Sequence, residues 1–223
     1  MDDLFLLLVM LVLPLIAQIG VSVTFKKYSK IASSRGITAD QAARQILDGN
    51  GLYSVRIERV SGNLSDHYSP KENVVRLSDS VYGQRSIAAI GVAAHECGHA
   101  CQHAEEYMPV MVRSAIVPAV NICSKFWYLV LVLSIAIFGT INFLTYVGIA
   151  MFGAVVLFQL VTLPTELDAS RRALKTLEGQ CILETDEISK AKKVLTAAAM
   201  TYVTALVTSI MQLLRLLLRV RRK

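Results

Sequence analysis

The sequence contains 40 consecutive residues, 126–165, without a charged side chain. A helix needs about 20 apolar residues to cross the ~30 Å hydrocarbon core of a bilayer, so this run is about twice the length of one crossing. We therefore expect a transmembrane hairpin with helices over 126–141 and 143–163 and a turn near residues 139–142. Both ends of such a hairpin return to the same side of the membrane.

Two further apolar segments lie near the ends of the chain. Residues 4–25 carry no charge, and because Asp2 and Asp3 stand where a signal peptide has positive charge, we expect an uncleaved anchor. Residues 194–214 are also uncharged and predict either a fourth crossing, which we favour, or a helix on the membrane face. With a hydrophobic fraction of 54%, the chain is expected to be a mainly α membrane protein with three to four transmembrane helices.

The basic residues indicate how the chain is oriented in the membrane. Lys26, Lys27, Lys30 and Arg35 follow the first apolar segment, so the positive-inside rule places the N-terminus outside and the next region in the cytoplasm. The net charge of +6 comes from residues that flank apolar segments and form no patch interleaved with aromatic side chains. The expected partner is therefore the lipid bilayer, and nucleic acid is not expected.

The motif HECGH, His95 to His99, lies in a segment from Ser86 to Tyr107 that has no proline and is rich in alanine, so we expect one helix. On a period of 3.6 residues the two histidines share one face, a turn apart, the separation at which two imidazoles bind one tetrahedral zinc ion. Glu96 lies beside the first histidine, where its carboxylate can take a proton from a water on the metal. The motif predicts a metallopeptidase.

An HExxH pattern also arises by chance on ordinary amphipathic helices. The apolar run Ile87 to Ala94 argues against chance here, because it would bury the helix. A buried cluster of two histidines and a glutamate is costly unless each group has a partner such as a metal.

A catalytic zinc ion takes three protein ligands and keeps one position open. Glu166 is the favoured third ligand, because we expect Pro164 and Thr165 to begin a helix directly after the hairpin, on the side of the membrane that carries His95. The alternative is that Glu166 and Asp168 are first-turn acids that only complement the helix dipole.

Other candidates fit the metal less well. His103 and Glu106 share the histidine face, but His103 lies about 12 Å along the axis from His95, which favours an indirect or surface role. Cys97 and Cys101 lie on another face and are expected to be small apolar fillers, with a CxxxC redox or second metal site as the alternative.

Residues 26–85 predict a small α+β region that joins the HExxH helix in a zincin-like catalytic region. A capping box at Thr38 begins a helix that ends at Gly49 to Gly51, and strands are expected over 55–60 and 74–78. We expect VVRLS, residues 74–78, to be an edge strand that binds the substrate backbone, or otherwise a strand that only covers the helix.

The turn-rich segment SDHYSP lies between these strands. His67 or Tyr68 in it is a candidate donor to the oxyanion that forms opposite the metal, and the alternative is an ordinary turn residue on a solvated loop.

The expected organisation has five segments: an anchor over 1–25, the zincin-like region over 26–113, the hairpin over 114–164, a helix with the third ligand over 165–193, and a C-terminal helix with a basic tail over 194–223.

The segments HECGHACQH, SDHYSP, VVRLS, FQLVTLPTELDASRRAL and AAAMTYVTALVTSIMQLLRLLLR together resemble the YugP-like neutral zinc metallopeptidase family of bacterial membrane proteins. The chain is more distantly similar to the HtpX and CAAX-protease metallopeptidases. The resemblance implies a gluzincin-type site in a bacterial cell membrane, with His95, His99 and Glu166 on one zinc ion and Glu96 as the base. The HtpX-like pattern has an aspartate where this chain has Ser170, which leaves the partner of the ligand histidine open.

The favoured function is an integral-membrane zinc endopeptidase that acts on membrane-associated or misfolded proteins. An intramembrane protease of the site-2 type is one alternative, but the run Ile87 to Ala94 is too short to span a bilayer and an LDG sequence occurs only upstream, at Leu47 to Gly49. A non-catalytic membrane scaffold with a structural zinc is the other. The sequence specifies neither the oligomeric state nor the cleavage preference.

Overall fold

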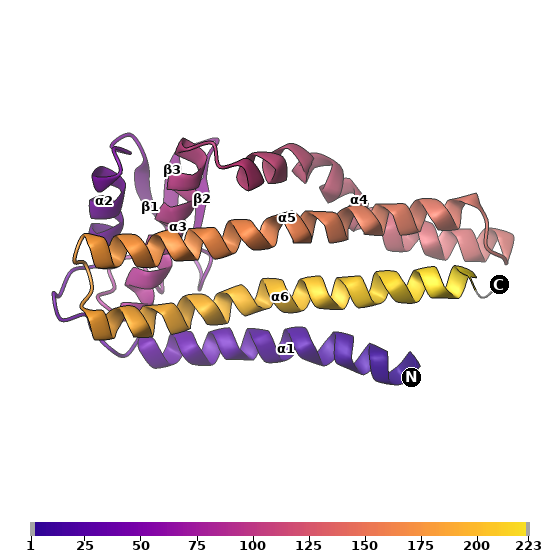
Figure 1. Cartoon of the computed structure of the whole chain (residues 1–223), viewed down its shortest axis with the longest axis horizontal. Coiled ribbons are helices and arrows are strands. Elements are labelled where there is room, and N and C mark those ends of the chain that lie inside the picture. The colour runs from indigo at the N-terminus through magenta and orange to yellow at the C-terminus, as the bar shows by residue number, and fades with distance from the viewer. Residues whose placement is uncertain (1–2, 222–223) are drawn as a thin grey trace. The chain divides into compact units, whose positions relative to one another are not determined.

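The computed structural model describes residues 3–221, which form six α-helices and one three-stranded sheet (Figure 1). The helices are α1 (Asp3–Tyr28), α2 (Ala39–Gly49), α3 (Ile87–Ala104), α4 (Met108–Phe138), α5 (Phe143–Gly179) and α6 (Thr185–Arg221), and the strands are β1 (Arg56–Val60), β2 (His67–Ser69) and β3 (Val74–Ser78). Among the described residues, α1, α4, α5 and α6 are long and apolar enough to cross a membrane. The expected fold class, a mainly α membrane protein with a small α+β region, is confirmed.

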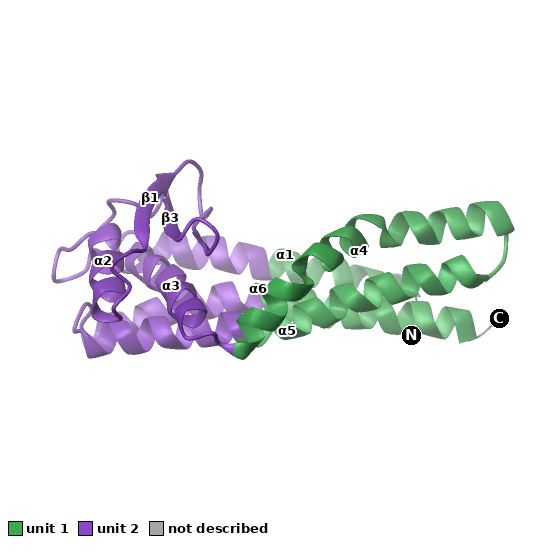
Figure 2. Cartoon of the chain, turned by 90° about the horizontal axis from the view of Figure 1, so that it is seen from above, with its two compact units in different colours: residues 1–16, 108–164, 201–223 green, residues 17–107, 165–200 purple. Residues whose placement is uncertain are grey.

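The chain divides into two compact units, which Figure 2 colours separately. The hairpin unit comprises residues 1–16, 108–164 and 201–223, and the sheet unit comprises residues 17–107 and 165–200. Helices α1, α5 and α6 each contribute residues to both units.

In the hairpin unit, α4 and α5 are joined by a tight turn at the expected place. Gly139 has a φ of +65°, a conformation that favours glycine, and the Asn142 side chain accepts a hydrogen bond from the Leu144 N–H at 2.8 Å. The hydroxyls of Ser134 and Thr145 are hydrogen bonded to each other at 2.6 Å. The turn therefore supplies hydrogen-bond partners to its own polar groups, as an apolar environment requires.

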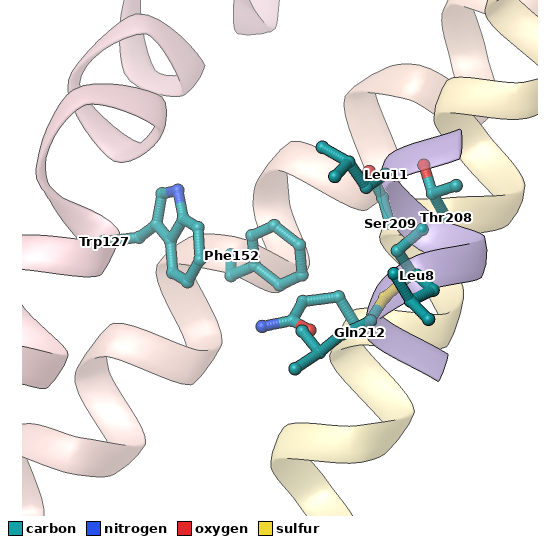
Figure 3. A pocket seen from close by; sticks show the side chains of 9 residues that line it. Leu8, Leu11, Trp127, Phe152, Thr208, Ser209 and Gln212 are labelled. Carbon is teal, nitrogen blue, oxygen red and sulfur yellow. The ribbon is translucent and has the colours of Figure 1, made fainter. Parts of the chain in front are cut away.

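An open groove of about 550 Å³ lies along the hairpin unit. Figure 3 shows Trp127 and Phe152 on one side of it, with ring centroids 4.4 Å apart, and residues of α1 and α6 on the other. The lining residues are Leu7, Leu8, Met10, Leu11, Trp127, Phe152, Thr208, Ser209 and Gln212. The groove brings three polar side chains of α6 beside an otherwise apolar surface.

Two expectations about where helices begin are wrong. Helix α4 begins at Met108, well before the apolar run at 126–141. Helix α5 does not begin at Pro164 but continues through it to Gly179. A proline in a helix interior removes one N–H donor, which packing and neighbouring side chains can offset in an apolar helix.

The single helix expected over 165–193 is in fact two. Helix α5 ends at Gly179, and Cys181 follows with a φ of +50° in the turn before α6. The Ile182 N–H donates to the Leu177 carbonyl at 2.8 Å, which satisfies one of the last acceptors of α5.

The core of the sheet unit forms where α2 and the sheet pack with α3. The capping box at Thr38 and Gln41 begins α2 as expected, and Ile46 and Leu47 on its apolar face are buried. Strands β1 and β3 are parallel and lie close to their expected positions.

The order of strands in the sheet is β1-β3-β2. The expectation that residues 74–78 form an edge strand is therefore wrong, because β3 is hydrogen bonded to β1 on one side and to β2 on the other. Strand β2 was expected as part of a turn-rich loop. It instead pairs antiparallel with β3, with Tyr68 opposite Val75.

Candidate metal centre

Helix α3 carries the HExxH motif and is fixed in the core by its apolar first half. Ser86 is its N-cap and accepts a hydrogen bond from the Ala89 N–H at 3.2 Å. Ile87 and Ile90 are fully buried. The helical period then places His95 and His99 on one face, with ring centroids 4.7 Å apart.

Helix α5 crosses this face at very close range because α3 has a glycine at the contact. A Cβ atom added to Gly98 would lie 2.6 Å from the Ala169 carbonyl oxygen of α5. Only a residue without a side chain fits at this distance. The absence of a Cβ at Gly98 thus allows α5 to bring its polar residues to the two histidines.

Glu166 of α5 contacts both histidines. Its Oε2 atom lies 3.3 Å from His95 Nε2 and 3.5 Å from His99 Nε2, and the side chain is only 3% exposed. One ligand atom from each of the three residues lies within 4.8 Å of the others. Two imidazole nitrogens and a carboxylate oxygen are the donors that zinc takes in catalytic sites, so the donor set fits this metal.

The second nitrogen of each imidazole has a polar partner. His95 Nδ1 lies 3.1 Å from the Ser170 hydroxyl, and His99 Nδ1 lies 3.0 Å from Gln102 Oε1. Because these contacts engage both Nδ1 atoms, the Nε2 atoms are directed to Glu166. Ser170 is the position at which this chain departs from the HtpX-like pattern, whereas the sequence did not indicate Gln102.

Asp168 extends this polar cluster away from the histidines. Its Oδ2 atom accepts hydrogen bonds from Gln102 Nε2 at 2.9 Å and from Arg172 Nε at 2.6 Å. Arg172 also forms an ion pair with Glu105 at 2.7 Å. Asp168 therefore has specific partners, and the alternative that Glu166 and Asp168 are first-turn acids is wrong, because α5 begins at Phe143.

Glu96 lies beside His95 on α3. It is 8% exposed, and its Oε2 atom accepts a hydrogen bond from the Tyr68 N–H of β2 at 3.1 Å. The sheet edge formed by β2 thus holds the Glu96 carboxylate in one orientation.

His67 has different surroundings from those of Tyr68. His67 is exposed, and its Nδ1 atom lies 2.9 Å from the Ser65 carbonyl oxygen. Tyr68 packs against the core and its ring lies 6.1 Å from that of His103. Of the two, the residue that contacts Glu96 is Tyr68, through its backbone.

Among the described residues, the possible metal-binding group is His95, His99 and Glu166, and it does not include Cys97, Cys101, His103 or Glu106. Cys97 is fully buried with its thiol 3.6 Å from the Ala43 carbonyl oxygen, and burial raises the pKa of that thiol well above its usual range. All four cysteines are free thiols.

Two opposing effects act on the protonation of His99. Burial lowers the pKa of the imidazole, but the hydrogen bond to Glu166 and the charge of Glu96 raise it, and the net shift is upward from 6.5.

Fold and site together have the features of a membrane zinc metallopeptidase: long apolar helices, an HExxH helix, and a glutamate from a second helix beside both histidines. The chain belongs to the family described as "Putative neutral zinc metallopeptidase", whose sequence model matches residues 4–221. It is 47% identical over 199 residues to "Putative membrane protease YugP" of Bacillus subtilis (strain 168), covering 89% of this chain and 88% of that protein. No solved structure matches the chain.

Proposed function

We propose that this protein is an integral-membrane zinc endopeptidase that cleaves membrane-associated or misfolded proteins. The observation that carries the proposal is the cluster of His95, His99 and Glu166, whose ligand atoms lie within 4.8 Å of one another. The family and the named relative support zinc and peptidase activity in a membrane protein.

In this proposal His95, His99 and Glu166 would hold one zinc ion. Zinc bound there would supply a Lewis acid for a peptide carbonyl and lower the pKa of a water toward neutrality. Glu96 would be the general base, accepting a proton from the attacking water and passing it to the leaving amine. Its hydrogen bond from the Tyr68 N–H keeps the carboxylate in place for this step.

Strand β2 is the part of the sheet best suited to bind the substrate backbone. It is an edge strand, and the Tyr68 N–H on its outer edge points to Glu96. A peptide that adds to this edge as a further strand would lie beside the proposed base. This role replaces the one expected for residues 74–78.

The proposed substrates follow from where Glu166 lies in the sequence. It comes directly after 40 uncharged residues and on the same continuous helix, α5. A ligand this close to an apolar span favours a site near the bilayer surface and substrates associated with the membrane.

The test is cleavage of casein by the purified full-length protein in detergent. The Glu96→Gln variant should bind zinc like the wild type but lose most of its cleavage rate, by about 10²-fold or more for a removed base. Glu178→Gln, the same change at an exposed position of α5, is the control and should keep full activity.

Unchanged activity of Glu96→Gln would remove Glu96 from the mechanism. Stoichiometric zinc in a wild-type protein that cleaves nothing would instead support the non-catalytic zinc scaffold.

A further inference from the structure

Gln102 is a fully buried glutamine on α3, one turn after His99. Its Nε2 atom lies 2.8 Å from the Thr165 carbonyl oxygen and 2.9 Å from Asp168 Oδ2. Its Oε1 atom lies 3.0 Å from His99 Nδ1. The amide thus joins α3 to α5 and contacts a histidine of the proposed zinc site.

The two partners of Nε2 determine which way the Gln102 amide faces. A backbone carbonyl and an ionised carboxylate are both acceptors, so only the NH2 group of the amide can face them. The reverse orientation would leave the amide oxygen against two other oxygens. The Gln102 carbonyl oxygen therefore has to face His99.

This orientation fixes the position of the proton on the His99 ring. Since Gln102 Oε1 is an acceptor, His99 Nδ1 must carry the hydrogen. A ring that keeps its hydrogen on Nδ1 binds a metal through Nε2, the nitrogen that lies 3.5 Å from Glu166 Oε2. Glu166 is an acceptor beside Nε2 when no metal is bound, so the contact with Gln102 matters when zinc replaces the proton there.

Arg172 holds Asp168 in place on the side away from Gln102. It donates to Asp168 Oδ2 at 2.6 Å and pairs with Glu105 at 2.7 Å, so Asp168 is held in its acceptor position. His95 has no equivalent control, because the Ser170 hydroxyl beside its Nδ1 atom can either donate or accept.

We propose that Gln102 is a positioning residue that fixes His99 as the Nδ1–H tautomer, under the control of Asp168 and Thr165, and so prepares its Nε2 atom for zinc. This inference rests on the proposed zinc site. The Gln102 amide orients His99, and Asp168 acts on His99 only through that amide.

The first test is zinc affinity, measured by competition with a chelator on the full-length protein in detergent. Gln102→Met keeps the side-chain length and removes the hydrogen bonds, and it should bind zinc about 10- to 100-fold more weakly. Asp168→Ala leaves Thr165 as the remaining acceptor and should weaken binding by less. Cys97→Ala, also buried on α3, is the control and should bind zinc like the wild type.

The second test distinguishes positioning from a general loss of structure. Long-range ¹H–¹⁵N NMR of the zinc-loaded protein reports which nitrogen of His99 carries the proton and which one binds the metal. Wild-type His99 should show a protonated Nδ1 whose hydrogen exchanges slowly with water, because Gln102 Oε1 accepts it. In Gln102→Met this hydrogen has lost its acceptor and should exchange faster.

Wild-type zinc affinity in Gln102→Met, or an unchanged exchange rate of the His99 Nδ1 hydrogen, would overturn the proposal. If Gln102→Met does not fold, Asp168→Ala decides it: weaker zinc binding supports the proposal, and unchanged binding overturns it. Neither measurement depends on peptide cleavage, so failure of the proposed peptidase activity would be recognised separately.

Discussion

Glu166 is the residue on which the proposed metal centre depends most, because it comes from a different helix than the two histidines. Replacing it with alanine should weaken zinc binding by roughly a hundredfold, since zinc sites with four ligands gain about 10–16 kcal/mol, or roughly 3 kcal/mol per ligand. The measurement is chelator competition on the purified variant. Glu178→Ala on the same helix is the control, and equal zinc affinity in both variants would contradict the assignment.

Zinc binding should also depend on pH in a way set by His99. The metal requires a neutral imidazole, and the pKa of His99 is raised because the hydrogen bond to Glu166 and the charge of Glu96 outweigh burial. The raised pKa means that protons should begin to compete with zinc at a pH above 6.5, the usual pKa of histidine. Below the pKa of His99, the zinc affinity should fall by about tenfold per pH unit. Titration of zinc affinity between about pH 8 and 5.5 checks this, and a flat profile would contradict it.

At the scale of single residues, the sequence predicted which side chains share a face of a helix. His95 and His99 share a face because of the helical period alone. Gln102 also follows from that period, three residues after His99, but its role depends on which atoms of α5 lie opposite it. Local sequence does not contain that information, so the contact with Asp168 was found only in the structure.

At the scale of elements, the close contact of α3 with α5 depends on Gly98. Gly98→Ala would put a Cβ atom 2.6 Å from the Ala169 carbonyl, which backbone movement must relieve. We expect a loss of about 1–3 kcal/mol in stability and weaker zinc binding, because Glu166 moves with α5. Thermal unfolding and chelator competition measure the two effects.

Gly91→Ala is the matched control on the same helix. The added Cβ would meet the Ala191 Cβ atom at 3.5 Å, an ordinary contact, so stability should change little or rise with the better helix former. Equal effects of the two substitutions would show that the α3–α5 approach does not depend on Gly98.

Elements were predicted less completely than residues. The amphipathic pattern and capping box of α2 identified it, but the order of strands is a long-range property, and β3 was wrongly placed at an edge. Pro164 is a typical helix-start residue in the sequence, but α5 continues through it. A local signal was overridden here by the packing of a long apolar helix.

At the scale of the whole molecule, we predict that the turn between α5 and α6 lies in the cytoplasm and that the α4–α5 turn lies outside. Cys181, in the turn between α5 and α6, is an exposed free thiol. A membrane-impermeant maleimide should label it only after the cells are permeabilised. The physical reason is the density of basic residues on that side of the apolar segments.

The matched control uses the other turn. Thr140 is exposed, so Thr140→Cys in a Cys181→Ser background should be labelled in intact cells. Labelling of Cys181 in intact cells would reverse the proposed orientation of the catalytic region.

Composition and charge were sufficient to predict the class of the molecule and its candidate membrane spans. Uncharged runs are a direct physical signal, because a bilayer excludes charge over a known thickness. How the ends of those runs meet is a tertiary property, and the sequence indicated Glu166 as the third ligand without fixing its contacts.

X-ray absorption spectroscopy of the zinc-loaded wild-type protein tests the central claim most directly. We predict one zinc ion with two imidazole nitrogens and oxygen ligands at about 2.0–2.2 Å, from His95, His99, Glu166 and water. A sulfur ligand at about 2.3 Å would place a cysteine on the metal, and together with the absence of paired imidazoles it would contradict the proposed site.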